Sequence, residues 1–279
     1  MRVAIPHPTR VIFPEAAITR EQMVAYYEAM SQWILPRWRN RAITLVRWPH
    51  GLQGPHFYQR HDPRLDPAQP IAIDSAEDLV YWAARGAIEF HVPLGQRDAP
   101  RLHDWAVIDL DPDPPASWAQ VAEAAAILLR LFDQLKVAVY LKTSGKRGLH
   151  LFVAIAPTPA EAVTRALGEL ATAVAQRFSR LLTVERSVVR RQGRVYLDYL
   201  QNAGTRTMAG VFSLRATSRA TVSTPIGRHE LGKDPQFWTL STVLAQASER
   251  AGYFPARPEP VNLLAKLNGA LGGRPVGGR

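Results

Sequence analysis

The chain has 279 residues, of which 47% are hydrophobic, enough for one large domain with a substantial core. Its 34 Lys and Arg residues against 24 Asp and Glu residues give a net charge of +10, which favours polyanionic partners such as DNA, RNA or an anionic membrane. The absence of cysteine excludes disulfides, thiolate zinc sites and cysteine nucleophiles. Because no apolar run approaches the roughly 18 residues of a membrane span, we expect a soluble, intracellular protein with no membrane partner.

Two helices and one strand are expected in the first hundred residues. Apolar residues at helical spacing predict a helix over 19–35. Residues 41–47 predict a strand. Ser75, with an acidic residue three positions later, is typical of a helix start and predicts a second helix over 75–85. We therefore expect an N-terminal α/β module over about residues 1–100.

The central part of the chain has a more regular pattern. A strand, a helix, two strands, a long Ala-rich helix and a last strand are expected at 105–110, 117–135, 137–141, 149–156, 159–182 and 194–200. This order is βαββαβ, the ferredoxin-like unit, so we expect an α+β fold with its main sheet within about 101–256. The segment 257–279 is rich in Pro, Gly and Arg, which predicts a flexible tail or linker.

Asp109 and Asp111 end the first central strand. Side chains two positions apart on a strand share a face, so these two carboxylates would repel each other unless a positive charge lay between them. A hard divalent cation such as Mg²⁺ or Mn²⁺ takes oxygen ligands and would satisfy both. The alternative is a solvated acidic turn, and an isolated Asp-x-Asp cannot decide between the two.

A basic, Gly-containing segment follows between two expected strands. Its sequence, Lys-Thr-Ser-Gly-Lys-Arg-Gly-Leu-His over 142–150, combines glycines, hydroxyls and cations. Glycines let the backbone approach a phosphate, and Ser, Lys and Arg donate to its oxygens. The order of a Walker A loop is absent, and a basic β-hairpin is the alternative.

Topology relates these segments to a third acid, Asp198. An acid among the apolar residues of a strand is costly unless it is paired or bound to a metal, although an outward-facing position would make it ordinary. In a ferredoxin-like sheet the first strand lies between the third and the fourth and is antiparallel to both. We therefore expect Asp109, Asp111, His150 and Asp198 at one corner of the sheet, as two-metal phosphoryl transfer requires.

Four motifs follow one another along the chain. They are Asp-Leu-Asp-Pro at 109–112, Lys-Thr-Ser-Gly-x-x-Gly-x-His at 142–150, Asp-Tyr-x-Gln-Asn at 198–202 and Ser-Leu-Arg-Ala at 213–216. With them, the chain resembles the polymerase domain of bacterial DNA ligase D, a member of the archaeo-eukaryotic primase superfamily that acts in non-homologous end joining. The resemblance extends from His7 to about Pro255. It implies a primase-like fold, with the main sheet as the catalytic sheet of a domain over 1–256.

The resemblance implies roles for individual residues. Two divalent metals, Mn²⁺ or Mg²⁺, would be held by Asp109, Asp111 and Asp198. The incoming nucleotide would be contacted by a second set: His91, Ser144, Arg147, His150 and Arg215. Phe57 and Tyr58 match an aromatic pair that stacks on template bases, a contact that tolerates any base.

The family also recognises a 5′-phosphate on the downstream strand through basic N-terminal residues. Arg10 and Arg20 occupy positions that are commonly Lys, and Arg keeps the charge and adds a bidentate fork. His7 stands where other members carry a different polar residue. Ordinary solvated surface is the alternative for both arginines.

The resulting hypothesis is a DNA-directed primase-polymerase that adds NTPs or dNTPs to a primer 3′-hydroxyl at breaks or short gaps. DNA ends or gapped duplex with a 5′-phosphate, Ku and a DNA ligase in cis or trans are the expected partners, in the cytoplasm at the bacterial nucleoid. A non-catalytic DNA end-binding module is the alternative. A glycosyltransferase that uses Asp-x-Asp explains neither the +10 charge nor Asp198.

Overall fold

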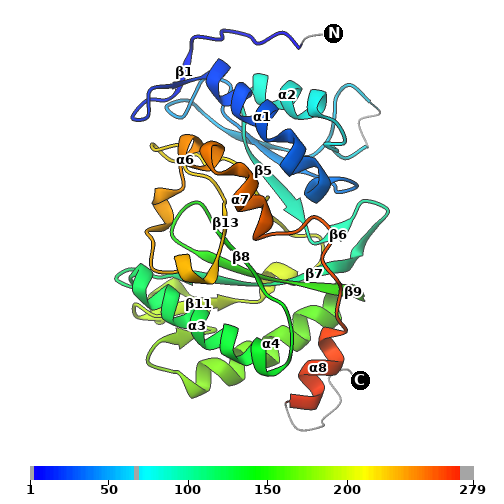
Figure 1. Cartoon of the computed structure of the whole chain (residues 1–279), viewed down its shortest axis with the longest axis vertical. Helices are drawn as coiled ribbons and strands as arrows, with labels where there is room; N and C mark the ends of the chain where they lie inside the picture. The colour runs from blue at the N-terminus through cyan, green and yellow to red at the C-terminus, as the bar shows by residue number, and fades with distance from the viewer. Residues whose placement is uncertain (1–2, 66–68, 271–279) are drawn as a thin grey trace.

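The structure, a computed structural model, describes residues 3–65 and 69–270. It is a mixed α+β fold with two lobes (Figure 1), the upper one built mainly from the N-terminal residues and the lower one from the central part of the chain. In the described parts of the chain, no helix is long and apolar enough to cross a membrane.

The lower lobe contains the larger of the two main sheets, with strands in the order β10-β11-β7-β9-β8-β13 and β6 paired to β7. These strands are β6 (Gly95–Gln96), β7 (Ala99–Pro112), β8 (Tyr140–Thr143), β9 (Leu149–Pro159), β10 (Leu182–Thr183), β11 (Val195–Asp198) and β13 (Pro225–Ile226). Helices α3 (Trp118–Gln134) and α4 (Ala160–Arg177) pack against β7 and β9 and lie below the sheet in Figure 1. The predicted βαββαβ order is confirmed, with β7 between β9 and β11 and antiparallel to both.

The upper lobe contains the smaller sheet, in the order β12-β5-β3-β4. Its strands are β3 (Thr44–Arg47), β4 (Phe57–Gln59), β5 (Ala87–Pro93) and β12 (Thr207–Ala209). Helices α1 (Arg20–Trp38) and α2 (Ala76–Ala84) pack against each other in the same lobe. The expected N-terminal module is thus completed by a strand from beyond the central block, because β12 pairs with the edge of β5 that β3 leaves open.

The remaining elements are short. They are β1 (Val11–Phe13), β2 (Ile18–Thr19), α5 (Val188–Arg191), α6 (Leu240–Ala245), α7 (Ala247–Gly252), α8 (Leu263–Ala270) and 3₁₀ turns at Leu200–Asn202, Arg228–Glu230 and Pro235–Phe237. Capping boxes begin α1 at Thr19, α2 at Ser75 and α3 at Ser117. The helix expected over 159–182 ends at Arg177, and the strand expected over 137–141 is β8.

The expected flexible tail over 257–279 is wrong for part of that segment. Val261 forms a parallel bridge with Ile155, which extends the edge of the main sheet. Helix α8 follows and packs against α4, with Leu263 and Leu267 buried. Apolar residues spaced four apart provide a face that can pack even where Pro, Gly and Arg dominate the composition. Residues 271–279 lie outside the described part of the chain.

Candidate active site

A row of titratable side chains crosses the main sheet. The strand register pairs Asp198 with Asp109, Asp109 with His150, and His150 with Lys142. Residues directly opposite each other on neighbouring strands project from the same face. Asp109 and His150 line a cavity together with His91 of the upper lobe, so this row faces the upper lobe. The structure therefore brings the three segments together as the topology predicted.

Two neighbouring acids of β7, Asp109 and Asp111, have shifted pKa values. Burial, followed by the charges of Asp111 and Asp198, raises the pKa of Asp109 to about 8. Burial also raises the pKa of Asp111, although the charges of Arg191 and Arg147 oppose the shift. Nearby like charges and burial both disfavour a carboxylate, so in the absence of a cation Asp109 retains a proton at neutral pH.

The three carboxylates do not form a ready-made metal cage. Within residues 3–65 and 69–270, no three Asp, Glu or His side chains are gathered closely enough to hold an ion. Asp111 Oδ2 lies 3.4 Å from Arg191 NH1, and Asp198 accepts hydrogen bonds from Gln201 Nε2 and the Leu200 N–H, both at 2.9 Å. The donor set nevertheless fits a hard divalent cation, since its oxygens share one face and positive charge would relieve their repulsion.

Lys142 determines how His150 presents its ring. Lys142 Nζ lies 2.7 Å from His150 Nδ1 and 2.6 Å from Ser223 Oγ, whose own proton goes to the Thr143 carbonyl at 2.8 Å. Burial and the charge of Arg215 lower the pKa of Lys142 well below its usual value. When Lys142 is an ammonium it only donates, so Nδ1 accepts and Nε2 carries the ring proton. That Nε2 lies 3.5 Å from Asp109 Oδ1. Burial and the charge of Lys142 lower the pKa of His150 well below its usual value, which makes the ring a neutral donor.

The segment 144–148 forms a tight turn against Arg215. Ser144 Oγ accepts a hydrogen bond from the Gly148 N–H at 2.9 Å, and Arg215 donates to the Ser144 carbonyl. Gly145 has φ +73°, and a Cβ there would lie 2.4 Å from Cγ of Arg215, so only glycine fits. Arg147 of this turn is exposed and lines the cavity described below.

Glu89 is a site residue that the sequence analysis missed. Its Oε2 lies 2.8 Å from His91 Nε2, and its Oε1 accepts the Ala216 N–H at 2.9 Å and forms an ion pair with Arg215 Nε at 3.2 Å. Burial would raise the pKa of Glu89, but the hydrogen bond with His91 and the charge of Arg215 hold it well below its usual range. An acid inside the apolar run Ala-Ile-Glu-Phe-His-Val-Pro of β5 was the available indication.

A cavity of about 340 Å³ joins these groups. Seven residues expected to act in catalysis or nucleotide binding line it: His91, Asp109, Asp111, Ser144, Arg147, His150 and Arg215. Asp198 lies beside Asp109 through the β7–β11 pairing. Gln201 also lines the cavity, and its contact with Asp198, like that of Arg191 with Asp111, was not anticipated from the sequence. The lining of this cavity therefore combines carboxylates with cations and N–H donors.

The two basic residues expected to bind a 5′-phosphate lie away from this cavity. Arg10 and Arg20 both donate to the Pro49 carbonyl, and Arg20 also donates to the Pro6 carbonyl at 2.7 Å. Arg20 is 3% exposed, so it is not the solvated surface cation of the alternative interpretation. Burial and the charge of Arg10 lower the pKa of Arg20. Two guanidinium groups held this close favour an anion beside them.

The predicted aromatic pair lies on the edge strand β4. Phe57 is 45% exposed and Tyr58 is 64% exposed, and the Arg47 guanidinium lies 5.1 Å from the Phe57 ring centroid. Two adjacent large side chains with this exposure mark a surface for a partner with planar groups.

Comparisons with known proteins point to one family. The model of the family "LigD, primase-polymerase domain" matches residues 19–254. Two similar proteins are the "Multifunctional non-homologous end joining protein LigD" of Pseudomonas aeruginosa, 33% identical over 273 residues, and the "Bifunctional non-homologous end joining protein LigD" of Bacillus subtilis, 31% identical over 252 residues. The alignments cover 90% and 84% of this chain but only 32% and 41% of those proteins, so the chain spans well under half of their length.

A solved structure with the same fold is described as "Polymerase Domain from Mycobacterium tuberculosis Ligase D in complex with DNA". It superposes with a TM-score of 0.82 at 25% sequence identity, and the match covers 90% of this chain and 96% of that one. The shared fold therefore includes both lobes.

Proposed function

The chain belongs to the LigD primase-polymerase domain family, and from this premise we propose that it is a nucleotidyltransferase that extends a primer 3′-hydroxyl at DNA breaks and short gaps. The observation that carries the proposal is the row Asp198–Asp109–His150, which faces His91 and Arg215 across one cavity. Carboxylates opposite phosphate-binding groups are what the transfer of a nucleotidyl group from an incoming triphosphate to a 3′-hydroxyl requires.

The proposed role of each residue follows from its charge. Asp109, Asp111 and Asp198 would hold divalent metal, Mn²⁺ or Mg²⁺, which when bound activates the 3′-hydroxyl and stabilises the leaving pyrophosphate. Arg215 and Arg147 neutralise phosphate oxygens, and His150 donates its Nε2–H to one of them. Other groups orient these contacts: Ser144 shapes the turn, and Glu89 holds His91 and Arg215 in place.

The DNA would follow the surface that joins this cavity to the N-terminal residues. Phe57 and Tyr58 supply base stacking, while Arg10 and Arg20 receive a 5′-phosphate on the downstream strand. Such a substrate implies work at the nucleoid in the cytoplasm, with Ku and a DNA ligase as partners in cis or trans. The net charge of +10 supports binding that weakens steeply with salt.

The proposal is tested by primer extension on a gapped duplex with and without a 5′-phosphate, with ribonucleotides and deoxynucleotides compared in Mn²⁺. Extension that is stimulated by the 5′-phosphate supports an end-joining polymerase. A protein that shifts the duplex in a gel but never lengthens the primer would instead be the non-catalytic end-binding module.

Metal binding should be visible in thermal stability and should depend on pH. In the metal-free protein the pKa of Asp109 is about 8 against an ordinary 3.8, so the stability that its proton provides is complete below about pH 4 and is lost as pH rises through 8. Mn²⁺ at saturating concentration should raise the Tm at pH 8 by about 5 °C. The increase should shrink as pH falls below 8, because the ion must displace the proton. A Tm increase that grows on acidification, or that persists in Asp109→Asn, would place the ion elsewhere.

The 5′-phosphate contact should depend on Arg10. Arg10→Gln removes the more accessible of the two guanidinium groups and should weaken binding to a 5′-phosphorylated gap by about tenfold, with little effect on the unphosphorylated gap. Fluorescence anisotropy with the two duplexes measures this difference. Arg177→Gln, at the end of α4, removes one exposed charge from another surface and serves as the matched control. Equal losses on both duplexes would show that Arg10 contributes only general charge.

A further inference from the structure

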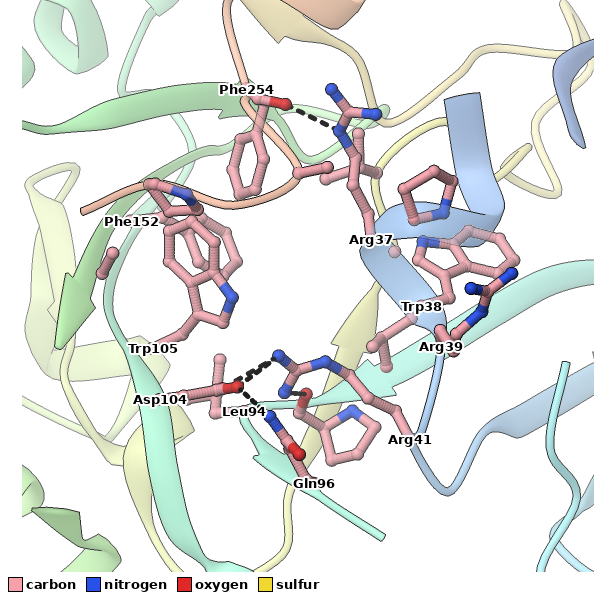
Figure 2. A pocket seen from close by; sticks show the side chains of 18 of the residues that line it. Arg37, Trp38, Arg39, Arg41, Leu94, Gln96, Asp104, Trp105, Phe152 and Phe254 are labelled. Carbon is pink, nitrogen blue, oxygen red and sulfur yellow. Dashed lines mark hydrogen bonds and ion pairs between the residues drawn. The ribbon is translucent and has the colours of Figure 1, made fainter. Parts of the chain in front are cut away.

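A second cavity, of about 490 Å³, lies beside the active-site cavity (Figure 2). Met208 and Ala209 of β12 line both cavities, so this strand separates them. Lys142 lines the second cavity, while its Nζ contacts His150 in the first. The volume falls within the roughly 300–1,000 Å³ of typical small-molecule sites. None of the roles proposed above uses this space, which we call the aromatic cavity.

One wall of the aromatic cavity is a cluster of three rings. Trp105, Phe152 and Phe254 lie with centroids 5.0 Å apart for Trp105–Phe254, 5.3 Å for Phe152–Phe254 and 5.7 Å for Trp105–Phe152. Figure 2 shows these rings on one side of the space and Trp38 and Arg41 on the other. Trp38, Phe152 and Phe254 are buried, whereas Trp105 is half-buried, so Trp105 offers the ring face on which a planar ligand can lie.

The opposite wall contains a hydrogen-bond donor without a partner. Trp38 is 1% exposed and its Nε1 has no hydrogen-bond acceptor. Figure 2 shows the nitrogen of Trp38 on the edge of its ring that faces the cavity, and the nitrogen of Trp105 likewise directed inward. An indole N–H can only donate, and a buried donor left unpaired is costly. A planar ligand with acceptor atoms would give this donor a partner and remove that cost. The ring nitrogens of a nucleobase are such acceptors.

Two arginines add positive charge to the lining of the cavity. Arg39 and Arg257 line it and are exposed, and within the described residues neither forms an ion pair or hydrogen bond through its side chain. The neighbouring cations differ, since Arg41 Nη2 donates to both carboxylate oxygens of Asp104, at 2.9 and 2.8 Å, and Arg37 donates to three backbone carbonyls. Two uncommitted guanidinium groups suit an anionic group such as phosphate.

We propose that the aromatic cavity is a second nucleotide site, which takes a base against Trp105 with an acceptor atom toward Trp38 Nε1, and a phosphate at Arg39 and Arg257. The same chemical unit is offered by a free nucleoside monophosphate and by the terminal nucleotide of a single strand. The site is separate from the metal-binding row, and its existence does not depend on whether the chain polymerises nucleotides.

Calorimetric titration with AMP in the absence of divalent metal tests the site. Ala154→Met places a larger side chain into the cavity from β9 and should weaken AMP binding by about tenfold or more. The double variant Arg39→Gln/Arg257→Gln should weaken AMP binding by about fivefold and leave adenosine binding unchanged. Arg177→Gln, which removes an exposed charge at the end of α4, is the matched control and should leave AMP affinity within about twofold.

Spectroscopy on the unaltered chain keeps the test independent of how the variants fold. AMP should shift the indole N–H resonances of Trp105 and Trp38 and leave that of Trp118, which donates to the Leu231 carbonyl, in place. A 5′-phosphorylated tetradeoxyadenylate that displaces AMP and loses affinity in Ala154→Met would identify a strand end as the source, and one that does not displace AMP would identify the free nucleotide. The proposal is overturned if AMP does not bind, or if Ala154→Met binds AMP as tightly as the unaltered chain does.

Discussion

Asp109→Asn is expected to lower the rate of primer extension by at least about a thousandfold while duplex affinity changes by less than about twofold. Asp109 is the centre of the row, paired with Asp198 on one side and His150 on the other, so its replacement by Asn removes the carboxylate charge at the middle of the proposed metal site. Asn keeps the shape and removes the charge that the burial of this position opposes. Without metal, the variant should therefore be at least as stable as the parent chain.

Single-turnover extension and duplex anisotropy on the same preparations measure the two quantities. Asp133→Asn is the matched control, because Asp133 is an exposed acid on α3 that pairs with Arg228, and exposed pairs contribute little. Extension by the control should be unchanged. Full extension by Asp109→Asn would refute the assignment of this row as the metal-binding centre, whatever the family suggests.

The parts of the fold that the sequence predicted are those set by local patterns. Ser75 and Ser117 mark the starts of two helices. In the central block, the change between helical and strand periodicity separates the elements. The resulting βαββαβ order leaves few topologies. Once the strand order is known, the pairing of Asp109 with Asp198 and His150 follows from antiparallel register. The row was predictable because each step of the prediction rests either on a local sequence pattern or on the strand order.

The parts that the sequence did not predict depend on contacts between distant segments. Glu89 becomes a site residue only because the segment that follows Ser213, more than 120 positions later, packs against β5. Arg20 begins a helix in a pattern typical of solvent exposure, yet two carbonyls from other segments enclose it. The aromatic cavity combines α1, β5, β7, β9, β12 and the residues around Phe254, and no local pattern marks such a meeting point.

The second large effect is expected for Glu89→Gln. The ionised carboxylate holds His91 and Arg215 at once, and the amide would keep the volume but lose both charge-assisted contacts. Removing one partner of a buried ion pair leaves the other uncompensated and costs about 3 kcal/mol of unfolding free energy. Because His91 and Arg215 both face the expected triphosphate, the KM for the incoming nucleotide should rise by roughly tenfold or more, with a smaller change in kcat.

Urea unfolding and steady-state extension separate a structural effect from a positioning effect. Glu161→Gln, which breaks an exposed pair with Arg101, is the matched control and should change neither stability nor KM appreciably. Glu89→Asp keeps the charge with a shorter reach and should recover part of the nucleotide affinity, which a purely structural role would not require. If Glu89→Gln lost stability but kept its KM for the nucleotide, His91 and Arg215 would reach the nucleotide without this carboxylate. Glu89 would then act on the fold alone, and the orientation of Arg215 would have to come from its contact with the Ser144 carbonyl.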